Sequence, residues 1–149
     1  MQNQAGFTLI ELLAVIAILV VLGFLGMTAF ATYKASAAYA VASQTYADSR
    51  RALEAGMNDI DRALPEVPLF SQKVKGILQD PSARSLLAGF VLPDNVKFTI
   101  AFDPQCEEEG CERSMIQVNH CFATEAIRWV QFGDGMEFLF SHLAEPGCN

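Results

Sequence analysis

Hydrophobic residues are concentrated near the beginning of the chain, in one long run. From Leu12 to Tyr33 there is no charged residue, and Thr28 and Thr32 are the only polar interruptions before the tyrosine. About 20 such residues are enough for a helix to cross the hydrocarbon core of a bilayer. The large aliphatic side chains of the run cover every face of a helix, which suits a lipid environment or a tightly packed helical bundle. The run therefore predicts a transmembrane helix.

After this run the pattern becomes amphipathic. Because residues three and four apart share one face of a helix, the segment up to Ala55 predicts a continuation of the same helix. Gly56 is expected to end it as a C-terminal glycine, and the apolar face is expected to carry a globular head. That predicted face consists of Phe30, Tyr33, Ala37, Ala40, Val41 and Ala47.

Residues 57–95 predict an irregular connector, since prolines occur throughout it. Within it, Asp80 followed by Pro81 is a typical helix start, and a short helix is expected over Asp80–Gly89. The prolines of the connector are Pro65, Pro68, Pro81 and Pro93.

Alternating hydrophobic and polar residues in the last third of the chain predict three or four β-strands. The last two are expected to form a hairpin across Gly133-Asp134-Gly135, although the segment before this turn also allows a short helical turn. A small antiparallel sheet packed on a long N-terminal helix gives the fold class α+β. The predicted strands are Val96–Asp103, Ser114–Cys121, Ala126–Phe132 and Met136–Leu143.

Charge and motifs exclude several kinds of function. The 149 residues carry a net charge of −7, of which Glu11 supplies one, so the part beyond the apolar run carries −6. An acidic body repels phosphate, which disfavours DNA binding as its main activity. No Gly-rich phosphate loop and no catalytic arrangement of Ser, His or paired carboxylates can be singled out. We therefore expect no enzymatic activity, no catalytic residue, no cofactor and no metal site.

Three interpretations of the N-terminus remain open on composition alone. A cleaved signal peptide fits the small residues of Ala29-Phe30-Ala31 and Ala35-Ser36-Ala37. However, the apolar run exceeds the usual core of about 7–15 residues, and the first six residues lack Lys and Arg. An uncleaved membrane anchor is the second interpretation, but it explains Glu11 only as a carboxylate that reaches toward the headgroups.

The third interpretation comes from "GFTLIELL", Gly6 through Leu13, which closely resembles the processing site of type IV prepilins and of the related pseudopilins of type II secretion. This resemblance implies that a membrane peptidase cleaves between Gly6 and Phe7 and then methylates the new amine of Phe7. It divides the chain into a leader (1–6), a transmembrane and assembly helix (7–33) and a pilin-like head (34–149). Two features depart from the family pattern: the leader is not basic, and Thr28 stands where many pilins have a helix-kinking Pro.

Glu11 falls on the glutamate at position five of the mature chains of this family. A carboxylate at the centre of a membrane helix costs about 2.5–3.5 kcal/mol, and less near an end. Cleavage would supply a positive amine at Phe7, and such a pair attracts by about 4 kcal/mol at about 4 Å and an effective dielectric constant of about 20. The resemblance implies that the amine can come from a neighbouring subunit, so Glu11 is predicted to act in assembly.

The four cysteines, in an exported head, predict two disulfides with three connectivities open. The C-terminal disulfide loop of many pilins favours Cys121–Cys148, which leaves Cys106–Cys111. A zinc site formed by Cys106, Cys111, His120 and Cys121 is an alternative, although its spacing matches no ordinary zinc finger. Calcium binding is a second alternative to the absence of a metal site, with Asp103, Glu107, Glu108 and Glu109 as ligands. The simpler interpretation of these residues is an acidic loop that is exposed to solvent.

The resemblance implies a structural subunit of a type IV pilus that serves adhesion, motility or DNA uptake. Its partners would be other pilin subunits, the prepilin peptidase, and the assembly platform and ATPase. The precursor would cross the inner membrane once, and the mature chain would enter a periplasmic to extracellular filament. One alternative is a minor pseudopilin of type II secretion. Another, of a different class, is a soluble binding domain released by signal peptidase.

Overall fold

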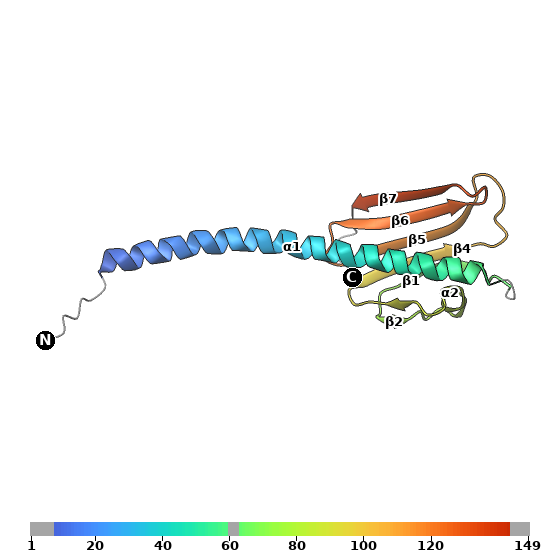
Figure 1. Cartoon of the computed structure of the whole chain (residues 1–149), viewed down its shortest axis with the longest axis horizontal. Helices are drawn as coiled ribbons and strands as arrows, with labels where there is room; N and C mark the ends of the chain where they lie inside the picture. The colour runs from blue at the N-terminus through green and yellow to red at the C-terminus, as the bar shows by residue number, and fades with distance from the viewer. Residues whose placement is uncertain (1–7, 60–62, 144–149) are drawn as a thin grey trace. The chain divides into compact units, whose positions relative to one another are not determined.

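The computed structural model describes residues 8–59 and 63–143. Its longest element is helix α1, Leu9–Met57, which is continuous (Figure 1). The chain divides into two units, one up to Lys34 and one from Ala35 onward. The two parts of α1 are therefore described separately.

In the second unit, five strands form an antiparallel sheet in the order β1-β4-β5-β6-β7 (Figure 1). Ile100 pairs with Ile116, and Ile116 pairs in turn with Trp129, so buried side chains of three neighbouring strands lie on one face. This arrangement confirms the α+β prediction, and the segment before the last turn is a strand, not a helical turn. The strands are β1 (Val67–Gln72), β4 (Val96–Phe102), β5 (Glu112–His120), β6 (Glu125–Phe132) and β7 (Glu137–Leu143).

Small residues of α1 form the face that packs on this sheet, and the predicted face was wrong. Ala37, Ala40 and Val41 are exposed in the structure. Small side chains let the helix axis come close to the sheet, and buried hydroxyls are tolerated where they bond to the helix backbone. Thr45 donates to the carbonyl of Val41 at 2.8 Å. The buried residues of α1, spaced by three or four, are Ala38, Ala42, Thr45, Ser49 and Leu53.

The connector is more regular than predicted. It contains edge strand β1, the two-stranded sheet of β2 (Gly76–Ile77) and β3 (Val91–Leu92), and helix α2 (Pro81–Leu86). Pro68 made β1 look irregular in the sequence, but an edge strand tolerates proline because its outward N–H groups need no partner. The register of β1 also shifts between Val67 and Phe70. The short helix is confirmed, and its cap is Asp80, whose Oδ1 accepts the N–H of Ala83 at 2.7 Å.

Gly56 lies inside α1 and does not end it in a left-handed conformation, which corrects the prediction. Its role is close packing between α1 and α2. A Cβ atom at this position would collide with the backbone carbonyl oxygen of Leu86. Glycine is required here because it lacks a side chain.

Gly56→Ala should therefore destabilise the head by about 1–3 kcal/mol, the range of overpacking in a close-packed core. Alanine gains about 1 kcal/mol of helix propensity over glycine, but the colliding atom is backbone, so α2 must move as a whole. Denaturant unfolding of the full chain in lipid nanodiscs, followed by circular dichroism, measures the difference. Gly26→Ala is the matched control, because a Cβ atom there has no neighbour within 4 Å. Equal midpoints for both variants would contradict the packing role.

Candidate functional site

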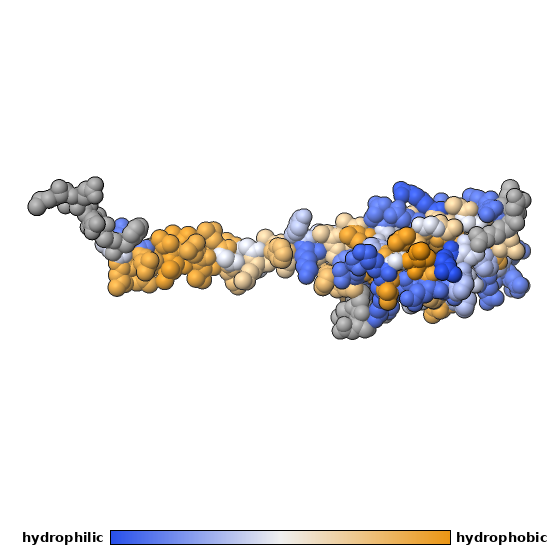
Figure 2. Space-filling model, turned by 90° about the horizontal axis from the view of Figure 1, so that it is seen from below, coloured by the Kyte–Doolittle hydropathy of each residue, from blue (hydrophilic) through white to orange (hydrophobic). Residues whose placement is uncertain are grey.

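The amino-terminal part of α1 is apolar and exposed on every side. No residue of α1 before Lys34 is buried, and hydrophobic residues cover most of the visible surface of this segment (Figure 2). By length and composition, α1 is long and apolar enough to cross a membrane. An exposed helix of this kind needs lipid or other apolar helices around it.

Glu11 is held at the first turn of α1 by Thr8. The Oε2 atom of Glu11 accepts the backbone N–H of Thr8 at 2.9 Å and its hydroxyl at 2.8 Å. In return, the Glu11 N–H donates to Thr8 Oγ1 at 3.4 Å and to the Thr8 carbonyl at 3.1 Å. This reciprocal arrangement is a capping box, which satisfies N–H groups that lack partners inside the helix.

The capping box gives Glu11 a fixed position before any partner subunit is present. A carboxylate at a helix N-terminus is also stabilised by the helix dipole. The sequence interpretation missed Thr8, although the spacing Thr-x-x-Glu is itself a helix-start pattern. Gly6 and Phe7 lie outside the described residues, so cleavage between them and methylation of Phe7 stay predictions.

Nothing interrupts α1 at the position where many pilins carry a proline. The hydroxyl of Thr28 donates to the Leu25 carbonyl at 2.9 Å, and that of Thr32 donates to the Thr28 carbonyl at 3.2 Å. Both polar side chains are therefore satisfied within the helix, as an apolar environment requires. The helix also continues through Gly23 and Gly26.

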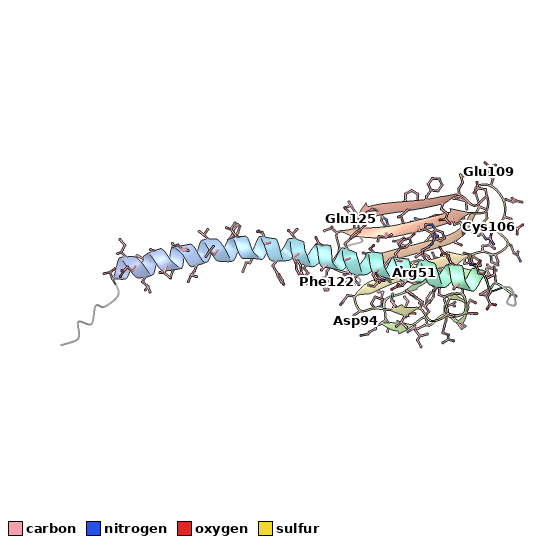
Figure 3. All side chains as sticks on the ribbon, viewed as in Figure 1. Arg51, Asp94, Cys106, Glu109, Phe122 and Glu125 are labelled. Atoms are coloured by element: carbon pink, nitrogen blue, oxygen red, sulfur yellow. A yellow bond between two sulfur atoms is a disulfide. The ribbon has the colours of Figure 1, made fainter. Side chains whose placement is uncertain are left out.

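The disulfide between Cys106 and Cys111 is present in the loop between β4 and β5. Figure 3 shows Cys106 and Glu109 at one end of the sheet, far from Glu125 at the other end. The loop packs closely on the β6–β7 turn, because a Cβ atom on Gly133 would lie 2.6 Å from the backbone oxygen of Glu108. The predicted hairpin across this turn is confirmed, with Phe132 N–H donating to the Met136 carbonyl at 2.9 Å.

The second predicted disulfide involves Cys148, which lies outside the described residues. None of the described cysteines is a free thiol. The pairing of Cys121 with Cys148 stays a prediction.

The zinc alternative fails because two of its four proposed ligands, Cys106 and Cys111, are joined to each other. His120 makes a hydrogen bond within its own segment of the chain, since its Nδ1 accepts the N–H of Phe122 at 3.2 Å. Burial lowers the pKa of His120 and so favours the neutral ring that this bond requires. Over residues 8–59 and 63–143, no group of three or more His, Cys, Asp or Glu side chains is placed to hold a metal ion, and this includes the acidic loop proposed for calcium.

Arg50 joins α1 to the sheet through an aromatic contact and two ion pairs. Its guanidinium carbon lies 3.9 Å from the ring centroid of Trp129, and it pairs with Glu54 at 2.9 Å and Glu137 at 3.2 Å. The Trp129 indole N–H also donates to Glu137 at 3.3 Å. Burial opposes the charge of Arg50, but the hydrogen bonds to Glu54 and Glu137 outweigh it and raise its pKa. Sequence analysis did not reveal this contact, because Arg50 and Trp129 are far apart in the chain.

A family model, the prokaryotic N-terminal methylation motif, matches residues 1–27. No curated protein matches the chain. The chain thus carries a type IV prepilin-type motif, which includes the capping box, on a pilin-like layout of a long helix and an antiparallel sheet. The motif supports a type IV pilin-like or pseudopilin-like protein and is consistent with an inner-membrane precursor.

Proposed function

We propose that this protein is a structural subunit of a type IV pilus, made as a precursor and assembled through its amino-terminal helix. The observation that carries the proposal is the prepilin-type motif on a continuous helix whose apolar surface is exposed on all sides. Such a surface is stable first in lipid and then against the same surface of neighbouring subunits. The protein acts mechanically and is not an enzyme.

Cleavage between Gly6 and Phe7 supplies the step that makes assembly possible. It removes the leader and creates an amine at Phe7, four positions before Glu11 in the chain. A subunit in lipid holds the Glu11 carboxylate with Thr8. In a filament, the amine of a neighbouring subunit can pair with the same carboxylate and offset its desolvation. A membrane peptidase performs the cleavage, and a platform protein and a cytoplasmic ATPase drive the assembly.

A minor pseudopilin of type II secretion is the second candidate. The membrane segment favours it, because Thr28 replaces the proline of many pilins and α1 is continuous there. The four cysteines of the head favour the pilus. Sheared cell-surface filaments that contain the chain would support the pilus. Its confinement to the cell envelope, with a secretion defect on deletion, would support the pseudopilin.

Intact-mass analysis of the protein from its native membrane tests the processing on which both candidates depend. The expected mature chain begins at Phe7 with one methyl group on its nitrogen. Gly6→Val should block cleavage and leave the precursor in the membrane, because a β-branched side chain replaces the hydrogen of glycine at the cut. Gly23→Val is a control in the same helix that should still be cleaved. A mature chain that begins at Thr32 or Ala38 would indicate signal peptidase and refute the proposal.

A further inference from the structure

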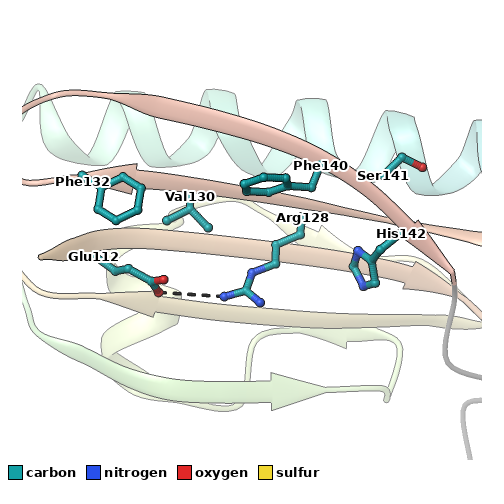
Figure 4. A pocket seen from close by; sticks show the side chains of 7 residues that line it. All are labelled: Glu112, Arg128, Val130, Phe132, Phe140, Ser141 and His142. Carbon is teal, nitrogen blue, oxygen red and sulfur yellow. Dashed lines mark ion pairs between the residues drawn. The ribbon is translucent and has the colours of Figure 1, made fainter. Parts of the chain in front are cut away.

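The face of the sheet opposite to α1 contains a hollow of about 450 Å³ that no feature of the proposed assembly uses. Strand register places it there: Arg128 and Val130 of β6 flank Trp129, whose side chain packs in the core beneath α1. The side chains that matter for the argument come from three neighbouring strands (Figure 4). They are Glu112 of β5, Arg128, Val130 and Phe132 of β6, and Phe140 and His142 of β7.

Arg128 is the charged group of this hollow with unused hydrogen-bonding capacity. Its Nε atom is buried and has no hydrogen-bond partner among the described residues. Its Nη2 atom lies 3.9 Å from Glu112 Oε2, which is too long for a hydrogen bond. A guanidinium carries five N–H donors in a planar fork that matches a carboxylate. The Arg128 side chain is 40% exposed to solvent, so a ligand can reach it.

An apolar surface lies beside this guanidinium. Val130 is buried and forms part of the floor, whereas Phe140 remains 48% exposed next to it. Figure 4 shows the guanidinium of Arg128 between Glu112 and His142, with the two phenylalanine rings along the other side of the hollow. An exposed aromatic surface next to an incompletely bonded cation suits a ligand with an anionic end and an apolar body.

His142 provides a second polar contact at the same end. Its Nε2 lies 3.5 Å from the Nε2 of Gln117, an amide nitrogen that can only donate. This contact favours the tautomer with the proton on Nδ1. The ring can then donate a hydrogen bond to an anion beside Arg128.

We propose that the hollow binds a carboxylate attached to an aromatic or aliphatic group of about the size of one phenylalanine, with Arg128 holding the carboxylate. The ligand is either a free acid or the last residue of a peptide, since both present the same chemistry. Glu112 disfavours more highly charged anions at this position. The proposal is independent of processing and filament assembly.

Fluorine NMR of N-acetyl-4-fluorophenylalanine, added to the full chain in lipid nanodiscs, tests the site. The expected result is saturable line broadening with a dissociation constant of about 1 mM or below, after subtraction of empty nanodiscs. The methyl ester of the same probe lacks the carboxylate charge and should bind at least about ten-fold more weakly. A tetrapeptide that ends in 4-fluorophenylalanine, with a free or an amidated C-terminus, shows whether a chain end is accepted as well as the free acid.

Variants separate the proposed contacts from nonspecific adsorption. Arg128→Gln should weaken binding of the acid at least about ten-fold and leave the ester unaffected. Phe140→Ser should weaken both probes, because it removes apolar surface. Arg51→Gln is the control, since Arg51 is exposed and pairs only with Asp48 among the described residues. Equal binding of acid and ester, or unchanged binding by a folded Arg128→Gln variant, would overturn the proposal.

Discussion

Glu11→Val should leave a cleaved, methylated subunit in the membrane and reduce its incorporation into filaments by at least about ten-fold. The carboxylate is fixed at the first turn by Thr8 and is the only charged side chain of α1 before Lys34. Valine removes the attraction of this carboxylate to the amine of a neighbouring subunit, and loss of one partner of a desolvated charge pair shifts an equilibrium by more than about ten-fold. The ratio of subunit in sheared filaments to subunit in membranes measures the effect, and intact mass confirms that processing is unchanged.

Two further variants separate the charge of Glu11 from its role in the capping box. Glutamine also serves at this position of a capping box, so Glu11→Gln preserves the cap and removes the charge. Thr8→Val removes the cap hydroxyl and preserves the charge. If the charge drives assembly, Glu11→Gln should be nearly as defective as Glu11→Val, whereas Thr8→Val should be less affected. Normal incorporation of Glu11→Gln would show that Glu11 acts only as a cap.

The elements that the sequence predicts well are those defined by local patterns. The long uncharged run near the N-terminus leaves few alternatives to a membrane helix. The alternation of hydrophobic and polar residues predicted the positions of β4 through β7 to within a few residues. The helix at Pro81 was also predictable, because an Asp-Pro pair supplies both the cap and the first helical residue. In each case the physical cause lies within a few neighbouring residues.

The elements that the sequence predicts poorly depend on distant contacts. Val41 looks like a core residue of an amphipathic helix, yet the sheet packs on the smaller Ala38, Ala42 and Thr45. Gly56 looks like a helix end, but its role depends on Leu86, thirty residues later. The hollow beside Arg128 also requires three strands in register. Local propensity does not report which residues approach one another in space.

The contact of Arg50 with Trp129 gives a prediction for stability. Arg50→Met should destabilise the head by about 2 kcal/mol, because it removes a partly desolvated cation–π contact and a charged hydrogen bond to Glu137. Methionine retains much of the apolar length of the side chain, so the loss reports mainly on the charge. The ion pair with Glu54 contributes little to this estimate, because Glu54 is 52% exposed and solvent screens it.

Arg51→Met is the matched control for this prediction, since it removes the same charge one residue later. Arg51 is 73% exposed and pairs only with Asp48 among the described residues, so its loss should change stability by about 0.5 kcal/mol or less. Trp129 is the single tryptophan of the chain, and its fluorescence reports directly on the contact during denaturant unfolding in nanodiscs. Circular dichroism of the same samples follows the whole head. Because Arg50 links α1 to β6 and β7, the two probes should give the same lowered midpoint for Arg50→Met. Equal midpoints for the two arginine variants would mean that the stacked guanidinium contributes no more than a solvated charge.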